Sequence, residues 1–264
     1  MTSILPLLLY LAAGAVLLRS VRAHTGDRPP LALALAYLGV LIHGSILFRA
    51  IDAPSGLAFA ITDSASLVGF VIAVTTSAIA LQGGLAILPG LFWTLAGLLA
   101  VGTGLMAGFH ETHGEQWQIS LHIACAALAA GWLSMSAVIV ACLYYQNARL
   151  RSRAPLGALA LLPPVETLEK TLFRALGAGY VVLTVVLITG SFFVHDLVAQ
   201  HLVHKVALAV IAWGVFGVLL IGRVRWGWRG RKALRFTTAG FVILALAYFG
   251  SKFVLENVLG RHWG

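Results

Sequence analysis

The residues best suited to chemistry gather in one short stretch, "HDLVAQHLVHK", which runs from His195 to Lys205. It holds three histidines, an aspartate and a lysine between two long apolar runs, in a chain with only nine histidines and nine acidic residues. Such side chains can ligate a metal ion, hold a heme or carry protons. They are also typical of the hydrated turn between two membrane helices, so the rest of the sequence has to decide among four interpretations.

Zinc is the first metal to consider, because two short strings have suitable residue types. "HETH" at residues 110–113 and "HLVHK" at residues 201–205 each place two histidines three positions apart, a spacing that suits one face of a helix. Neither string has the H-E-x-x-H spacing of a zinc protease, and the chain has no C-x-x-C pair. The pattern therefore gives zinc little support.

The composition places the chain in a lipid bilayer. Of its 264 residues, 60% are hydrophobic and 10% are charged, whereas a soluble domain is about one quarter charged. The apolar runs continue over about 20 residues, which is the length of a helix that spans a bilayer and not the short alternating pattern of a β-barrel. The predicted fold class is an all-α polytopic membrane protein.

Eight apolar runs predict about eight transmembrane helices, at roughly residues 3–19, 31–49, 64–82, 86–107, 119–145, 172–194, 205–222 and 234–254. The first run is expected to be a retained span and not a signal peptide, because its arginines follow the apolar residues. The only sizeable connection is the inner loop at residues 146–170, so we expect residues 1–264 to form a single integral membrane domain.

The basic residues predict the orientation. All eighteen lysines and arginines except Arg49, Lys205, Lys252 and Arg261 fall in or beside the loops that follow the first, fifth and seventh runs. Under the positive-inside rule these loops face the cytoplasm, so both termini and "HDLVAQHLVHK" face outward. The net charge of +9 is therefore a topology signal, and no nucleic-acid partner is expected.

Sorted by this topology, every histidine except His24 lies in the outer half of the protein. His43 and His122 fall inside predicted spans, where ionisable residues are rare and usually functional, although either can simply hydrogen-bond a neighbouring helix. Heme iron takes one or two axial histidines in apolar or aromatic surroundings. Tryptophans stand near His122 and His262 at the outer ends, as they also do in ordinary interfacial belts.

Several strings resemble a known family. They are "ISLHIACAALAAGWLSMSAV" at residues 119–138, "GWRGRKA" at residues 227–233 after a span containing Trp213, and "AYFGSKFVL" at residues 247–255. They are similar to the cytochrome c assembly protein family, the CcsA-like heme-handling membrane proteins, and most similar to its YpjD/HemX-like branch. The resemblance covers roughly residues 60–264.

The resemblance implies a heme site at the outer face. Members that present heme carry a tryptophan-rich outer segment, W-G-x-x-W-x-W-D-P-K-E, flanked by two outward-facing histidines that ligate the iron. His122 and His262 match the two flanking positions, which implies that they are the axial ligands. The tryptophan-rich segment is replaced here by "AQHLVHKV" at residues 199–206, with Lys205 at the position of the family's lysine.

This replacement exchanges an aromatic platform for a titratable, cationic one. His201, His204 and Lys205 are expected to meet the heme propionates, which are carboxylates that favour cationic partners. The alternative is that His204 and Lys205 only snorkel at the start of the seventh span. His43 completes the predicted cofactor-binding residues, since it lies inside a span near its outer end.

The leading hypothesis is a membrane protein of the bacterial inner (cytoplasmic) membrane that binds or handles heme at its outer face during cytochrome c maturation. Its expected partners are the lipid bilayer, heme, and other maturation proteins or the apocytochrome. The alternatives are a transporter for protons or a small solute and a non-catalytic membrane scaffold. An independent enzyme has the least support, because the sequence has no nucleophile elbow, phosphate loop or paired carboxylates.

Overall fold

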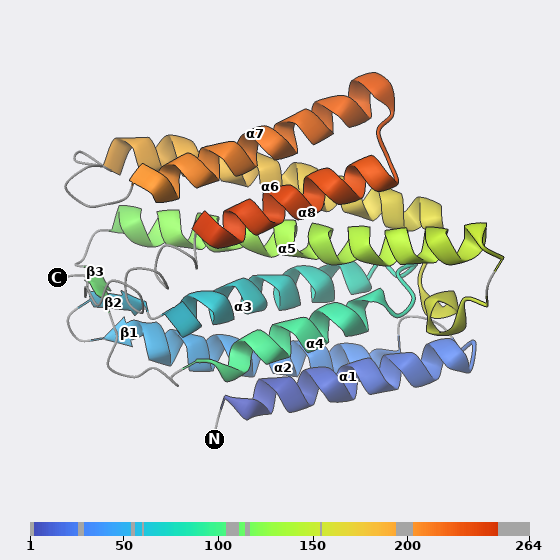
Figure 1. Ribbon diagram of the computed structural model, residues 1–264. Coiled ribbons are helices and arrows are strands. Elements are labelled where there is room, and N and C mark those ends of the chain that lie inside the picture. Colours follow the sequence, from blue (N-terminus) through green and yellow to red (C-terminus); the bar gives the residue numbers. More distant parts are fainter. Residues whose placement is uncertain are drawn as a thin grey trace.

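The computed structural model describes residues 3–25, 29–53, 56–59, 61–103, 111–113, 117–153, 155–193 and 203–247. These residues form a bundle of helices that run side by side (Figure 1). The helices are α1 (Ile4–Arg22), α2 (Pro30–Ile51), α3 (Ile61–Ala80), α4 (Leu88–Val101), α5 (Trp117–Arg151), α6 (Val165–Phe193), α7 (Val203–Trp226) and α8 (Arg231–Ala245).

Each of the eight predicted apolar runs overlaps one of these helices. Among the described residues, six helices are long and apolar enough to cross a membrane, namely α1, α2, α3, α5, α6 and α7, and α4 is a shorter apolar helix. The prediction of a helical polytopic membrane protein is therefore confirmed.

The expected inner loop at residues 146–170 is shorter in the structure. α5 continues to Arg151 and α6 begins at Val165, so that a 3₁₀ helix, Gly157–Leu161, and short turns make up the connection. The helix ends extend beyond the apolar runs because the last turn of α5 carries Arg149 and Arg151, cations that favour a helix C-terminus. Hydropathy alone does not detect such polar helix ends.

Two loops at one end of the bundle form a small sheet that the sequence did not predict. β1 (Asp52–Ala53), β2 (Gly56–Phe59) and β3 (Glu111–His113) pair antiparallel in the order β1-β2-β3. His113 lies opposite Leu57 in this ladder. Residues 111–113 of "HETH", which lie between two predicted spans, are therefore extended, so the spacing that suits one face of a helix does not describe them.

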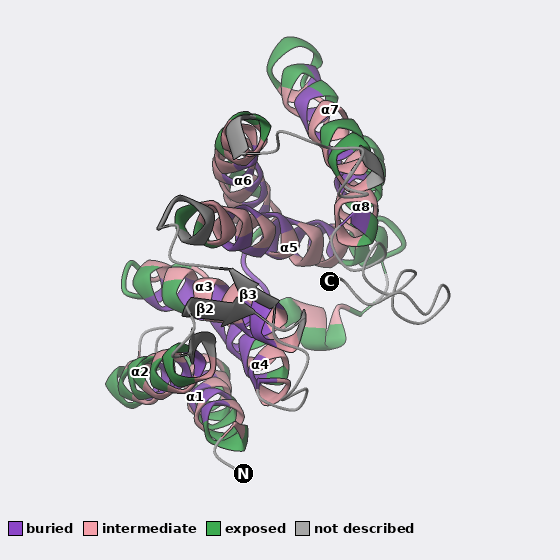
Figure 2. Cartoon of the chain, turned by 90° about the vertical axis from the view of Figure 1, so that its left-hand side faces the viewer, coloured by how far each residue is buried: buried purple, intermediate pink, exposed green. Residues whose placement is uncertain are grey.

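The helices form two groups of four. In the first group α1 packs against α2 and α4, and α3 packs against α2 and α4. In the second group α5 packs against α6 and α8, and α7 packs against α6 and α8. Contacts between α3 and α5 join the two groups, as the view along the helices shows (Figure 2).

Neighbouring helices are held together by close packing of their surfaces and by hydrogen bonds from indole rings. These interactions are expected inside lipid, where the hydrophobic effect contributes little to the association of helices. The indole N–H groups of three tryptophans donate to hydroxyls of the adjacent helix: Trp93 to Ser77 (3.0 Å), Trp132 to Thr75 (3.2 Å) and Trp213 to Thr184 (2.9 Å). These bonds connect α4 to α3, α5 to α3, and α7 to α6.

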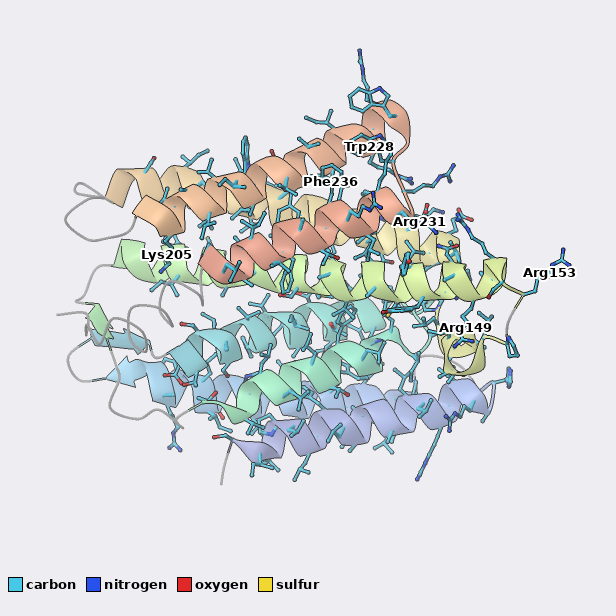
Figure 3. All side chains as sticks on the ribbon, in the orientation of Figure 1. Arg149, Arg153, Lys205, Trp228, Arg231 and Phe236 are labelled. Atoms are coloured by element: carbon cyan, nitrogen blue, oxygen red, sulfur yellow. The ribbon has the colours of Figure 1, made fainter. Side chains whose placement is uncertain are left out.

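The two ends of the bundle differ in charge. Arg149, Arg153 and Arg231 lie at one end, and Lys205 lies at the other (Figure 3). By the positive-inside rule the arginine-rich end faces the cytoplasm. We call the opposite end, where α5 and α7 begin and α6 finishes, the outer end.

The turn between α7 and α8 at the cytoplasmic end is built around Trp228. Gly227 adopts φ +63°, a conformation that favours glycine, and its N–H donates to the carbonyl of Arg223 (3.1 Å), which ends α7. The Trp228 ring then packs against Trp226 and Phe236, and the Lys232 ammonium lies 4.7 Å from its centroid. The tryptophans of this turn are typical of residues at a membrane interface.

The contact between α4 and α1 gives a test of the packing. A Cβ added at Gly97 would lie 2.9 Å from the Leu7 Cα, a backbone atom that cannot turn aside, whereas a Cβ at Gly214 of α7 would meet nothing within 4 Å. We expect Gly97→Ala to destabilise the protein by about 1–3 kcal/mol. Gly214→Ala should be neutral or stabilise by up to about 1 kcal/mol. Thermal unfolding in detergent measures both, and equal midpoints would contradict the close packing.

Candidate functional site

The outer end brings together three helices that are distant in the sequence. α5 and α6 pack along each other, and α7 packs on α6, so the start of α5, the end of α6 and the start of α7 meet at the same end of the bundle (Figure 1). His122 lies near the start of α5, Thr189 and Gly190 lie near the end of α6, and Lys205 lies near the start of α7. These four residues form the candidate site.

His122 is half-buried and is held against α6. Its Nδ1 lies 3.0 Å from the Thr189 hydroxyl oxygen. A Cβ added at Gly190 would lie 3.3 Å from the His122 Cε1 and 4.0 Å from its Nε2. The imidazole therefore rests on the α6 backbone at a position where a glycine leaves room for it, and the hydrogen bond to Thr189 fixes its rotation.

Lys205 adds a positive charge beside this imidazole. It is partly exposed in the first turn of α7, and Figure 3 shows it at the outer end of the bundle. Its charge lies close enough to act electrostatically on His122. An imidazole can ligate a metal ion, and an ammonium can pair with an anionic group.

The structure places the other predicted site residues as follows. His204 belongs to α7, but its side chain is outside the described part of the structure, and His201 and His262 are outside the described residues. The pairing of His122 with His262 as axial ligands, and the contacts of His201 and His204 with propionates, stay predictions.

His43 lies in the other half of the bundle and is not brought together with His122. It is in α2, is only 1% exposed, and lies edge-on to the rings of Tyr10 and Phe70. Its Nδ1 is 3.4 Å from the Tyr10 hydroxyl, and its Nε2 is 2.9 Å from the Ser66 hydroxyl. Its role in cofactor binding stays a prediction, and a ligand there would have to replace one of these hydrogen bonds.

Thr189 and Gly190 are the site residues that the sequence did not single out. Both stand at the outer end of an apolar run, where a hydroxyl residue and a glycine are common. The one available signal was their position just before "HDLVAQHLVHK". Among the described residues, no group of three or more histidines, cysteines or acidic residues is arranged to hold a metal ion.

Comparison with known proteins connects this arrangement to a family. The family model described as "Cytochrome C assembly protein" matches residues 31–259, which begins earlier than the resemblance seen in the sequence. The Inner membrane protein YpjD of Escherichia coli (strain K12) is 30% identical over 97% of this chain and 98% of its own length. No solved structure matches the chain.

Two further relatives match over shorter regions. An uncharacterized 28.8 kDa protein of Azospirillum brasilense is 36% identical over 54% of this chain and 53% of its own length. The Cytochrome c biogenesis protein CcsA of Gloeothece citriformis is 31% identical over 44% of this chain and 34% of its own length. Because the family model matches most of the chain, and its helices are those of a multi-pass membrane protein, this chain belongs to the cytochrome c assembly protein family.

Proposed function

We propose that this protein binds or handles heme at its outer end during cytochrome c maturation, in the inner membrane of a bacterium. Family membership supports the coarser statement, a membrane protein of cytochrome c maturation. The name of the Escherichia coli relative supports the location, and the name of the CcsA relative supports the process. The observation that carries the heme site is His122, a half-buried imidazole held by α6 beside the cation of Lys205.

The residues present fit a heme in their donor chemistry. A histidine nitrogen is a common axial ligand of heme iron, and His122 offers one at the edge of the membrane. Lysine is a suitable partner for a propionate, because a charge-assisted hydrogen bond to a carboxylate is among the stronger polar contacts. When bound, heme would supply an iron centre with axial positions for histidine, and the chain would supply the ligand and the cation that orient it.

The proposed roles combine this fit for His122 and Lys205 with the family resemblance for the other residues. His122 and His262 hold the iron, and Lys205, with His201 and His204, meets the propionates. Beyond lipid and heme, the partners we propose are an apocytochrome or other maturation proteins that receive or deliver the heme. An outward-facing site is the position from which such a transfer outside the cytoplasm is possible.

Absorbance spectroscopy tests the proposal directly. Protein purified after expression with ample heme should show a Soret band, and replacing both His122 and His262 with alanine should remove most of it, because iron then loses its axial ligands. His24→Ala is the matched control, since His24 is exposed at the cytoplasmic end of α1. A wild-type protein without a Soret band, or a double variant with an unchanged one, would refute the heme site.

Lys205 gives a second test, which concerns the propionates. Lys205→Gln should weaken heme binding about threefold to tenfold, a modest loss because the side chain is partly exposed and screened by solvent. The wild-type affinity should also fall as salt is added, and the variant's affinity should fall less. Heme titration followed by absorbance measures both effects, with Lys232→Gln at the cytoplasmic end as control. Identical salt dependence in the two proteins would remove Lys205 from the site.

A second candidate function is transfer of protons or a small solute through the first group of helices. It rests on the buried chain Tyr10–His43–Ser66 and on Asp63, which is fully buried near the outer end of α3. Ionisable residues inside spans often mark such pathways. Vesicles containing the purified protein and an internal pH dye would show proton entry that His43→Gln abolishes. Equal rates with the wild type, the variant and empty vesicles would exclude it.

A further inference from the structure

The hydroxyl of Thr189 has three polar neighbours, and together they determine where its proton lies. Its Oγ1 is 2.9 Å from the carbonyl oxygen of Val185, 3.2 Å from that of Val186, and 3.0 Å from the Nδ1 of His122. The two carbonyls belong to the preceding turn of α6. The histidine belongs to α5, so the hydroxyl lies between its own helix and the proposed ligand.

A hydroxyl has a single proton to donate, whereas a carbonyl oxygen can only accept. Two oxygen atoms 2.9 Å apart attract each other only when a proton lies between them. The Thr189 proton is therefore directed at the helix carbonyls, as is usual for threonine within a helix. The hydroxyl oxygen then offers a lone pair to His122, and this contact is favourable only if the His122 Nδ1 carries a hydrogen and donates it.

A neutral imidazole has one N–H group and one nitrogen with a lone pair. If the hydrogen is on Nδ1, the lone pair is on Nε2, which is the form of histidine that ligates a metal through Nε2. We propose that Thr189 is a positioning residue that fixes His122 as the Nδ1–H tautomer and so presents its Nε2 lone pair to heme iron. This inference rests on the proposed function for the identity of the ligand.

Gly190 contributes to the position of His122 as well. The ring edge that carries Cε1 and Nε2 lies over this glycine, where even a methyl group would come within 3.3 Å of Cε1. Thr189 therefore fixes one edge of the imidazole by a hydrogen bond, while Gly190 provides the space for the other edge. A histidine held at both edges loses little rotational freedom when it binds a metal, which favours affinity.

The tautomer can be measured without heme. In protein with ¹⁵N-labelled histidine, kept in detergent at about pH 8, where an ordinary histidine is neutral, the nitrogen shifts of His122 distinguish a protonated Nδ1 from a protonated Nε2. The His122→Ala spectrum assigns the signals. We expect the wild type and Thr189→Ser to show the Nδ1–H form, and Thr189→Val, which has the same shape without the acceptor, to populate the Nε2–H form. An unchanged tautomer in Thr189→Val would overturn the proposal.

Heme titration then tests the consequence. Groups that orient a histidine ligand typically change metal affinity by about 10–100-fold, so Thr189→Val should weaken heme binding by that factor, while Thr189→Ser should stay within about threefold of the wild type. Thr184→Val is the matched control, because Thr184 lies in α6 like Thr189. Its hydroxyl accepts a hydrogen bond from the Trp213 indole of α7 and donates one to the Tyr180 carbonyl of the preceding turn. Weakening by both valine variants to the same extent would indicate a general loss of packing and overturn the specific role.

The two proposals fail in different ways. If the wild type binds no heme, the proposed function fails, and the tautomer measurement still decides whether Thr189 sets the form of His122. If the wild type binds heme through His122 and Thr189→Val binds it equally well, the proposed function stands and the role of Thr189 is wrong.

Discussion

The packing of α5 is the constraint on which the rest of the structure depends. Three consecutive residues in its middle contact both groups of helices: Gly131 approaches Val71 of α3, Trp132 donates to Thr75 of α3, and Leu133 fills the space above a glycine of α6. That glycine is Gly179, where an added Cβ would lie 2.9 Å from the Leu133 Cγ. α5 therefore holds α3 on one side and α6 on the other, without room for either to shift.

This contact in the middle of α5 also determines the geometry at the outer end. Since α5 and α6 run in opposite directions along a shared interface, the close approach at Leu133 and Gly179 sets the rotation of α6 where it meets the start of α5. At that rotation Thr189 and Gly190 face His122. The geometry of the candidate site is thus a consequence of packing about three helical turns deeper, in keeping with membrane helices that are held by close van der Waals contact and interhelical hydrogen bonds.

The sequence predicted what depends on hydrophobicity and charge, and it missed what depends on helix rotation. Continuous apolar runs were sufficient to predict eight helices, and the basic residues were sufficient to predict which loops share one end of the bundle (Figure 3). The hydrogen bond between His122 and Thr189 joins positions 67 residues apart, and no periodicity reveals which faces of two apolar helices meet. The strands β1–β3 were missed for a related reason. They are too short to show an alternating pattern, and β3 pairs with a strand from a loop distant in the sequence. His43 was recognised as unusual from its place inside a span, but its partners Tyr10 and Ser66 come from two other helices.

The two histidines inside spans show how surroundings separate residues of the same type. His43 is enclosed by Tyr10 and Phe70, and both of its ring nitrogens contact hydroxyls, so it connects α2 to α1 and α3. A polar group inside lipid must find protein partners, and this arrangement provides them. His122 instead lies near the outer end of the bundle, half-buried and near the cation of Lys205. The two histidines therefore differ in burial and in partners, and a cofactor-binding role stays a prediction for both.

Under the proposed function, the replacement of tryptophans that the resemblance implies would change what holds a heme. Stacking of heme on indole rings buries apolar area and is insensitive to salt. An interaction between Lys205 and a propionate would be electrostatic, and ions in solution would screen it. Under the proposed function, "AQHLVHKV" in that position would leave a larger share of the binding free energy to the bond between iron and its axial histidines. An axial bond is strong only when the ligand nitrogen has the lone pair in place before heme arrives. If the proposed site lacks the aromatic platform, the group that holds His122 in that form gains importance, and we propose Thr189, 3.0 Å from its Nδ1, for this role.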